Sequence, residues 1–252
     1  MLITKGNPQT FPELNGKIET IRYPVYIEPK LDGITEWLYR NDGRPYLING
    51  NGKILSDLPI TREITIPTGV NRMLGEFHYG EGKAGDFYKI KGAKEDDINF
   101  TIFDVDLPLP YLDRRKWLIE NMRSTKHVSI VLAIMGLNKE HVLEEYNRFV
   151  NQMGYEGIVI KSFDSRLIMG SCPWVKMKKT ETLDLKVAAI SLNQERIEVL
   201  HGDVRVGVKC INRYKKDLKV GDLVEIKHKG VLEGGSLRHP VFLRKRDDKC
   251  DT

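Results

Sequence analysis

Short apolar segments separated by turn residues make up the first hundred residues of the chain. They are rich in β-branched and aromatic residues, which favour strands. Five of them predict strands, at 24–29, 34–40, 45–50, 70–79 and 99–105. Asn41-Asp42-Gly43, between the second and third segments, predicts a β-hairpin. The charged, glycine-containing segment 80–97 predicts an exposed loop, and residues 1–24 show few elements.

Helical periodicity appears in the middle of the chain, at 112–123 and 139–153. In the second of these segments apolar residues recur on one helical face, namely Val142, Tyr146, Phe149 and Met153. Gly154 is expected to end this helix. Two apolar segments that follow, 157–161 and 174–178, predict further strands.

The pattern changes at Leu185, where short apolar segments follow one another closely. Five strands are predicted, at 185–191, 196–200, 204–210, 223–228 and 241–246. Five short strands in so short a region are typical of a small barrel of the OB type. We therefore predict two domains, residues 1–184 and residues 185–252, with the boundary at Asp184.

The composition argues against a membrane-spanning, a secreted and a disulfide-rich protein. The chain of 252 residues is 40% hydrophobic, which is enough for a large and a small core. No apolar run reaches 18 residues, so we expect no membrane span, and the first residues do not resemble a secretion signal. Cys172, Cys210 and Cys250 are spaced neither as a zinc site nor as a disulfide framework. We expect a cytoplasmic protein.

The net charge of +5 is unevenly distributed along the chain. Residues 1–184 hold 25 basic and 25 acidic side chains, whereas residues 185–252 hold 15 and 10. A basic small domain suggests a polyanionic partner such as nucleic acid. The same modest excess also fits a domain that is simply kept soluble, and charge alone leaves both interpretations open.

Lys30 lies in the sequence Lys30-Leu31-Asp32-Gly33, directly after a predicted strand. Gly33 allows a tight turn there, so the lysine is expected to project from a fixed strand end. A lysine held among other cations can lose its proton near neutral pH and attack an electrophile. Taken alone, the motif is short, and Lys30 fits a solvated surface lysine as well.

Six motifs, however, follow one another along the chain. They are K-L-D-G at 30–33, L-G-E-F at 74–77, F-T-I-F-D-V at 100–105, E-G-I-V-I-K at 156–161, W-V-K-M-K at 174–178 and P-V-F-L-R-K-R-D-D-K at 240–249. In this order and spacing, from about residue 25 to 249, they resemble the nucleotidyltransferase motifs of ATP-dependent DNA ligases. The resemblance implies an α+β adenylation domain of antiparallel sheets with helices, followed by a mobile all-β OB-fold domain.

The resemblance assigns a role to each motif. It implies the catalytic residues Lys30, Asp32, Lys176 and Lys178. It implies that ATP is bound by Glu28, Lys30, Glu76, Phe103, Lys161, Lys176, Lys178, Arg244, Arg246, Asp248 and Lys249. Glu156 resembles the carboxylate that holds Mg²⁺, for which Mn²⁺ is an alternative, and oxygen ligands suit either ion.

Within this set the chemistry of each side chain fits its implied role. Lys30 would form lysyl-AMP, and Glu28 would accept a hydrogen bond from the adenine amino group. Glu76 resembles the ribose contact and Phe103 the ring that stacks on adenine. The C-terminal motif resembles the segment that orients the leaving pyrophosphate. Lys176 and Lys178 alternate along a strand, so both face one side and can contact the α-phosphate.

Each residue also has an ordinary structural interpretation. Phe103 alone fits a core position, Glu76 and Glu156 fit solvated or capping positions, and Lys176 with Lys178 fits a solvated strand face. The last residues fit a charged tail. Their joint occurrence in the order of one family favours the catalytic interpretation.

The chain departs from the family pattern at two positions. Thr35 and Gly50 stand where DNA ligases usually carry arginines that contact the nucleotide sugar or the phosphate of the nick. Arg40, Arg44 and Arg62 are candidates to replace them.

The resemblance implies an ATP-dependent DNA ligase that seals nicks in double-stranded DNA in three steps. It also implies a monomer that does not bind a membrane. The alternatives are an RNA ligase, a capping guanylyltransferase and an inactive OB-containing nucleic-acid-binding protein. An NAD-dependent ligase is disfavoured because its zinc cysteines are absent.

Overall fold

The computed structural model describes residues 8–10, 21–41, 44–49, 52, 54–55, 58–167, 174–179, 181–232 and 234–248. The chain divides into two compact units, Met1–Lys178 and Lys179–Thr252, which we call the large and the small unit. Asp184, the predicted boundary, lies inside strand β12 (Glu181–Ile190), because this strand already pairs with a neighbour at Glu181. No helix in the described ranges is long and apolar enough to cross a membrane.

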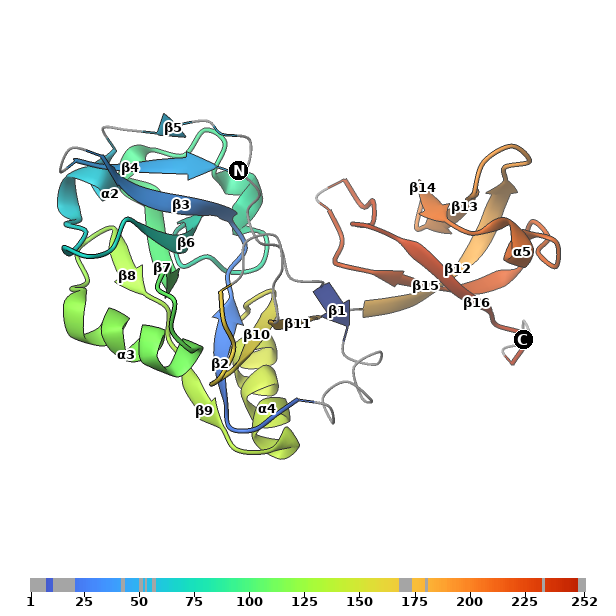
Figure 1. Cartoon of the computed structure of the whole chain (residues 1–252). Helices are drawn as coiled ribbons and strands as arrows, with labels where there is room; N and C mark the ends of the chain where they lie inside the picture. Colours follow the sequence, from blue (N-terminus) through green and yellow to red (C-terminus); the bar gives the residue numbers. More distant parts are fainter. Residues whose placement is uncertain are drawn as a thin grey trace. The chain divides into compact units, whose positions relative to one another are not determined.

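The large unit contains a six-stranded sheet of order β5-β4-β3-β6-β7-β8 (Figure 1). Its strands are β3 Ile34–Asn41, β4 Arg44–Asn49, β5 Ile54–Leu55, β6 Arg72–Tyr79, β7 Ile98–Val105 and β8 Val128–Ile130. The predicted hairpin is confirmed, because β3 and β4 pair antiparallel up to Asn41 and Arg44. β8 runs parallel to β7, since helix α3 (Tyr111–Asn121) intervenes and returns the chain in the same direction.

A five-stranded sheet, also in the large unit, has the order β1-β11-β10-β2-β9. Its strands are β1 Pro8–Thr10, β2 Val25–Lys30, β9 Ile134–Gly136, β10 Gly157–Ser162 and β11 Val175–Lys178. β10 pairs antiparallel with both β2 and β11, and Gly157 lies opposite Lys30 on one side and Lys178 on the other. This register brings three of the predicted motifs to one end of the sheet.

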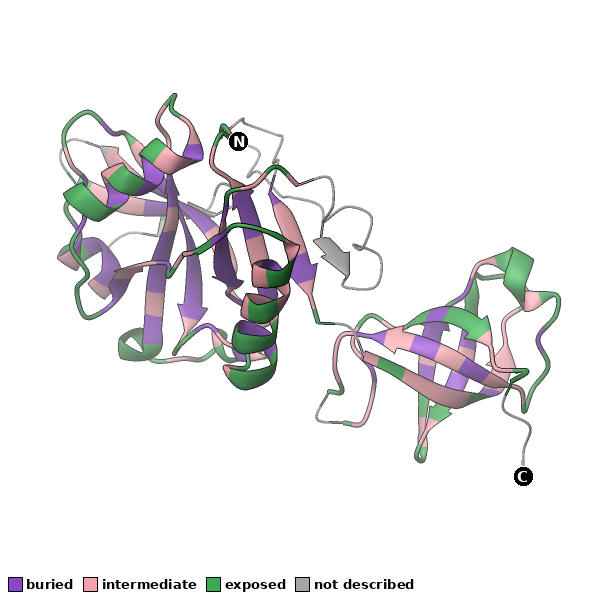
Figure 2. Ribbon diagram, turned by 90° about the horizontal axis from the view of Figure 1, so that it is seen from below, coloured by how far each residue is buried: buried purple, intermediate pink, exposed green. Residues whose placement is uncertain are grey.

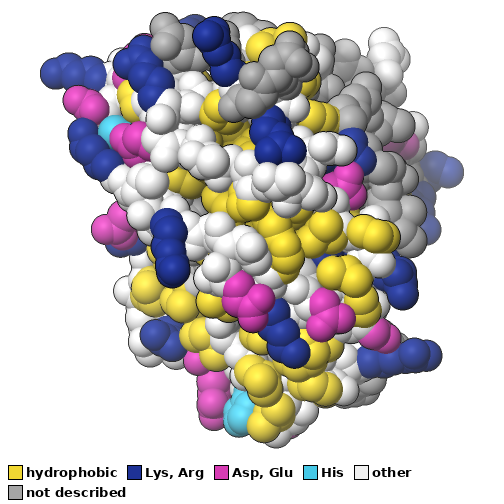
Figure 3. Space-filling model, turned by 60° about the vertical axis from the view of Figure 1, so that its left-hand side comes forward, with side chains coloured by type: hydrophobic (Ala, Val, Ile, Leu, Met, Phe, Trp, Pro, Cys, Tyr) yellow, Lys and Arg dark blue, Asp and Glu magenta, His cyan; other side chains and the backbone are white. Residues whose placement is uncertain are grey.

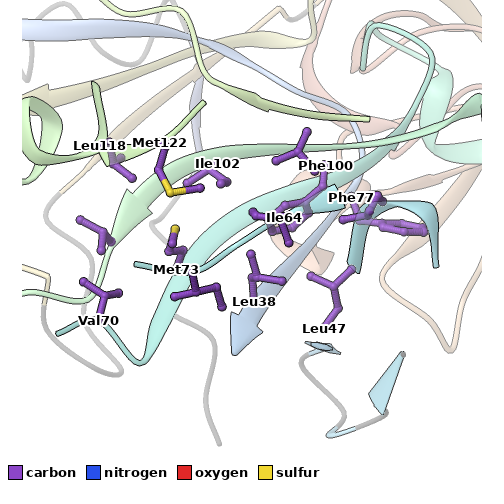
Figure 4. Close-up of a cluster of buried hydrophobic side chains, with 14 of the residues drawn as sticks. Leu38, Leu47, Ile64, Val70, Met73, Phe77, Phe100, Ile102, Leu118 and Met122 are labelled. Carbon is purple, nitrogen blue, oxygen red and sulfur yellow. The ribbon is translucent and has the colours of Figure 1, made fainter. Parts of the chain in front are cut away.

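Helices cover both sheets with apolar side chains. The predicted helix 139–153 is α4 (Lys139–Tyr146) continued by a π-helical segment η4 (Asn147–Gln152). Its predicted face packs on the five-stranded sheet, where Val142 and Phe149 contact Val25, Ile27 and Ile158 in one buried cluster. Figure 4 shows the second core of the large unit, in which side chains from α3 and its C-terminal end meet those of the six-stranded sheet.

The small unit is a closed barrel of five strands, in the order β12-β13-β14-β16-β15. The strands after β12 are β13 Arg196–His201, β14 Val204–Lys209, β15 Leu223–His228 and β16 Val241–Lys245. Alternate residues of β13, β14 and β15 are buried and belong to one hydrophobic cluster, and Figure 2 colours the buried positions of the barrel purple. Alternate residues of a strand point to opposite faces, so one face of each of these strands supplies the core.

Several elements are too short to be predicted from a periodic pattern of apolar residues. Strands β5, β8 and β9 have two or three residues, and helix α2 (Pro59–Glu63) has five, so none shows a period. Two short 3₁₀ turns, η2 (Asp86–Lys89) and η3 (Glu95–Asp97), lie within the predicted loop 80–97. Outside the described residues lie Asp42, Gly43, Gly50, Cys172, Lys249 and Cys250.

Candidate active site

A pocket with a cavity volume of about 60 Å³ opens in the large unit. Strands of both sheets contribute to its wall. The predicted residues that line it are Glu28, Lys30, Glu76, Phe103, Lys161 and Lys176, together with Thr35 and Trp174. Residues far apart in the sequence therefore share one site, because antiparallel pairing places β2, β10 and β11 side by side.

Lys30 lies at the end of β2 and donates from Nζ to Oε2 of Glu156. Lys178 donates to the other oxygen of the same carboxylate at 2.5 Å. Burial alone would raise the pKa of Glu156, but the two lysines outweigh it, and the pKa lies below its ordinary value. Glu156 is therefore held as a carboxylate that joins the candidate nucleophile to a second cation.

Glu28 lies two residues before Lys30 and is almost fully buried. Its Oε1 accepts from the hydroxyl of Tyr111, and its Oε2 pairs with Nζ of Lys161 at 2.8 Å. Burial raises the pKa of Glu28 above its ordinary value, whereas Lys161 and Tyr111 oppose the rise. Both oxygens are thus fixed by groups behind the pocket, and the carboxylate faces it in a set orientation.

Aromatic rings surround Lys161, whose side chain is fully buried. Its Nζ lies 4.2 Å from the ring centroid of Trp174 and 5.0 Å from that of Phe103, and it donates to the Phe103 carbonyl oxygen at 2.8 Å. The two rings meet edge to face at 5.7 Å. Phe103 is only partly buried and lines the pocket, so a planar group can reach it.

Glu76 occupies the wall beside Lys30. Its Oε1 accepts from the backbone N–H of Gly33 at 3.2 Å, and its Oε2 accepts from the hydroxyl of Thr35 at 2.9 Å. Burial raises the pKa of this carboxyl, and Lys30 is the strongest influence against the rise. Gly33 therefore does more than turn the chain, since its amide also orients a pocket residue.

Solved structures resemble this chain, although no protein-family model matches it and no curated protein matches it significantly. Pmar-Lig_PreS3 is 19% identical with a TM-score of 0.75, over 95% of this chain and 67% of its own. A structure of a Lig E DNA ligase is 18% identical with a TM-score of 0.70, over 98% of this chain and 100% of its own. The ligase domain of LigD from M. tuberculosis is 17% identical with a TM-score of 0.56, over 96% and 94%.

The chain has the fold of DNA ligases. The ligase fold includes both units, because the match to the Lig E structure covers nearly all of both chains. The resemblance drawn from the six motifs is thereby confirmed at the level of the fold. The likeness concerns the fold, and the reaction depends on the residues of the pocket.

Asp32 lies outside the pocket wall of this ligase fold. Its Oδ2 accepts from the N–H of Gly85 at 2.8 Å, and its own N–H donates to the Gly82 carbonyl oxygen at 2.9 Å. Ala84, in the same loop, donates to the Gly154 carbonyl oxygen at 3.0 Å. The geometry thus gives Asp32 a positioning task, which is to fasten the loop 80–86 against the end of β2.

The predicted C-terminal residues belong to the small unit of the ligase fold. Arg246 donates from Nη1 to Oδ1 of Asp184 at 2.9 Å and from Nε to Oδ1 of Asp248 at 2.8 Å. Arg244 donates to Glu225 at 2.6 Å. These pairs hold the segment after β16 against the barrel, and Lys249 lies outside the described residues.

A magnesium site near Lys30 would have few protein ligands. No group of three or more His, Cys, Asp or Glu residues in the described ranges could hold a metal. Mg²⁺ commonly takes one or two carboxylates together with substrate phosphates, so the carboxylate of Glu156 beside Lys30 is compatible with it. Glu156 fits this role if the ion arrives with the nucleotide.

Sequence reasoning missed Tyr111, which is fully buried and contacts Glu28 from the first turn of α3. Tyr111 belongs to none of the six motifs. In the sequence it looks like an ordinary core residue of a short helix. The contact arises because Tyr111, at the start of α3, lies against β2, where its ring meets that of Tyr26 at 5.9 Å, and only the fold decides this approach.

Proposed function

We propose that this protein is an ATP-dependent DNA ligase whose nucleophile is Lys30. The observation that carries the proposal is the pocket itself. Lys30 projects into it beside Glu156 and Lys176, while Glu28 and Phe103 line it toward the aromatic rings. One end thus suits a phosphate and the other a base, which is the arrangement that a nucleotide requires.

The first step transfers AMP from ATP to the enzyme. The neutral amine of Lys30 attacks the α-phosphorus, a P–N bond forms, and the bond from that phosphorus to the bridging oxygen breaks to release pyrophosphate. One N–H proton goes to solvent. Lys176 and Lys178 supply positive charge where the α-phosphate gains negative charge. A bound Mg²⁺ at Glu156 would neutralise further phosphate charge.

Base recognition is assigned to Glu28. An ionised carboxylate accepts hydrogen bonds but cannot donate them, so it fits the amino group of adenine and not the carbonyl oxygen of guanine. Phe103 offers a ring face for stacking. Glu76 is assigned to the sugar, and Lys161, which is bound to Glu28, orients that carboxylate for the base.

The two units are assigned as the adenylation domain and an OB-fold domain. Five strands in a closed barrel support the second assignment. We assign Arg244, Arg246, Asp248 and Lys249 to the leaving pyrophosphate. In the second step AMP passes to the 5′-phosphate of a nick, and in the third the 3′-hydroxyl displaces AMP. The substrate is nicked double-stranded DNA, and the enzyme acts as a monomer.

Two other functions are tested by the same experiment. Purified protein is incubated with labelled ATP or NAD, and then with matched nicked DNA, RNA and hybrid duplexes. Formation of lysyl-AMP from ATP followed by sealing of the DNA duplex supports the proposal. Sealing of RNA with inert DNA would make it an RNA ligase, and no labelled protein at all would leave a nucleic-acid-binding protein without ligase chemistry.

A further inference from the structure

Thr35 stands on β3 directly opposite Glu76 on β6, at the position where the family resemblance leads one to expect an arginine. Its hydroxyl donates to Oε2 of Glu76 at 2.9 Å, while the Gly33 amide donates to Oε1 at 3.2 Å. The two donors lie on opposite oxygens, so together they fix the rotation of the carboxylate.

Glu76 lies where a nucleotide sugar would lie. Glu28, Phe103 and Trp174 gather around buried Lys161 at one part of the pocket, where the two aromatic rings suit a base. Lys30 is next to Glu76 and belongs to the charged part that suits a phosphate. Because the sugar joins base and phosphate, the carboxylate beside the phosphate end faces the sugar.

A carboxylate accepts up to about four hydrogen bonds, and its two protein donors leave acceptor capacity for hydroxyl groups. A ribose presents two neighbouring hydroxyls, whereas a 2′-deoxyribose presents one. We propose that Thr35 is a specificity-determining positioning residue, which turns Glu76 so that it selects ribonucleotides over deoxyribonucleotides. The proposal rests on the proposed function, since it concerns the donor of the nucleotidyl group.

A β-branched substitution at Thr35 should leave the fold intact, because Thr35 is only partly buried and lies in a strand, where β-branched residues are favoured. Thr35→Val keeps the shape and removes the hydroxyl. Thr35→Ser keeps the hydroxyl and tests rescue. Thr182→Val is the matched control, since it makes the same change at an exposed position of β12 in the small unit.

The experiment measures lysyl-nucleotide formation by the full chain with ATP, 2′-deoxy-ATP and 3′-deoxy-ATP. We expect the wild type to prefer ATP and Thr35→Val to lose about tenfold of that preference, the usual effect of losing a hydrogen bond to a charged group. The loss should come mainly from a higher KM for ATP. Thr35→Ser should recover most of it, and Thr182→Val should behave as the wild type.

The outcomes separate the two proposals. A wild type that forms no lysyl-AMP from ATP overturns the proposed function. Normal reaction with ATP, but equal use of 2′-deoxy-ATP, overturns only the assignment of sugar selection, as does a Thr35→Val variant that keeps the wild-type ratio. If Thr35→Val melts at a lower temperature, Thr35→Ala replaces it in the same comparison, with the same criteria.

Discussion

At the scale of single residues, one carboxylate organises the charged end of the pocket. Glu156 accepts from Lys30 and from Lys178, and its lowered pKa shows that the pair of cations outweighs burial. A lysine held in this way has its Nζ fixed at the mouth of the pocket instead of moving through many rotamers. The site thus orders its candidate nucleophile before a substrate binds.

Replacing Lys30 with alanine should abolish adenylation from ATP, because no amine would remain at that point of the pocket. Lys30→Arg should fail as well, since a guanidinium stays protonated and cannot attack phosphorus. Intact-protein mass spectrometry checks both, with the wild type gaining one AMP. Lys116→Ala, an exposed lysine on α3, is the control. An AMP adduct that persists in Lys30→Ala would disprove the assignment.

Tyr111→Phe should shift the pH dependence of ATP binding. Tyr111 and Lys161 both lower the pKa of buried Glu28, so losing the hydroxyl raises that pKa further. Protonated Glu28 presents fewer acceptor sites to adenine, and KM for ATP should therefore rise as pH falls through the pKa of Glu28. In the variant this rise should begin at a higher pH.

The measurement is KM for ATP in adenylation from pH 5 to pH 8. Tyr155→Phe provides the control, because Tyr155 lies beyond η4 and its ring meets that of Phe149 edge to face. Identical pH profiles for Tyr111→Phe and the wild type would show that Tyr111 has only a packing role.

At the scale of elements, the close approach of β10 to β11 sets the site. Gly157 follows Glu156 and lies opposite Lys178. A Cβ built on Gly157 would lie 2.0 Å from the carbonyl oxygen of Met177, which a real structure cannot accommodate without moving the strands. Glycine here is required by the approach of a neighbouring backbone.

Gly157→Ala should therefore separate these strands and displace Glu156 from Lys30 and Lys178. We expect a loss of about 2 kcal/mol or more in the free energy of unfolding, as in other overpacked sites, and a strong loss of adenylation. Denaturant unfolding and labelled ATP measure the two effects. Gly234→Ala is the control, since nothing lies within 4 Å of a Cβ there. A fully active, fully stable Gly157→Ala protein would contradict the argument.

At the scale of the whole molecule, the two units are expected to divide the chemistry. Attack on ATP must expel pyrophosphate, a highly charged group, whereas closing the phosphodiester expels AMP. Arg246→Ala should therefore slow lysyl-AMP formation much more than the sealing of a nick that already carries 5′-AMP. Arg205→Ala, an exposed arginine on β14, is the control.

Two assays on one preparation test this expectation. One follows labelled ATP and the other a pre-adenylated nick. Because Arg246 also binds Asp184 and Asp248 within the barrel, thermal unfolding of the variant is measured alongside. Equal slowing of both reactions in a folded variant would refute the division of labour.

Binding of nicked DNA should be weak and should fall steeply with salt. The net charge is only +5, and basic and acidic side chains are interspersed on the face shown in Figure 3. Contacts of lysine and arginine with phosphates release counterions, and six of them would cost roughly 10³-fold in affinity between 50 and 200 mM salt. Fluorescence anisotropy of a labelled nick measures this, and tight binding that is unchanged over that range would contradict it.

The sequence by itself determined the local parts of this protein. Short apolar segments predicted the strands of the barrel, the Asn-Asp-Gly turn predicted the β3–β4 hairpin, and one apolar face predicted the packing of Val142 and Phe149. The family resemblance of its motifs also led us to expect Glu28, Lys30 and Glu76 at one nucleotide site, and the three residues line one pocket. These features depend on residues close together in the chain, or on motifs whose residues have a fixed spacing.

Only the tertiary structure decided which groups meet across sheets and helices. Tyr111 reaches Glu28 from 83 positions away, Asp32 turns from the pocket to the loop amide of Gly85, and Thr35 meets Glu76 through strand register. The small unit begins at Lys179, and β12 pairs with β15 from Glu181 onward, so Asp184 lies within a strand of the barrel. Such contacts depend on how the helices and strands pack. A contact between one pair of residues produces no periodic pattern in the sequence, so it cannot be predicted from the sequence.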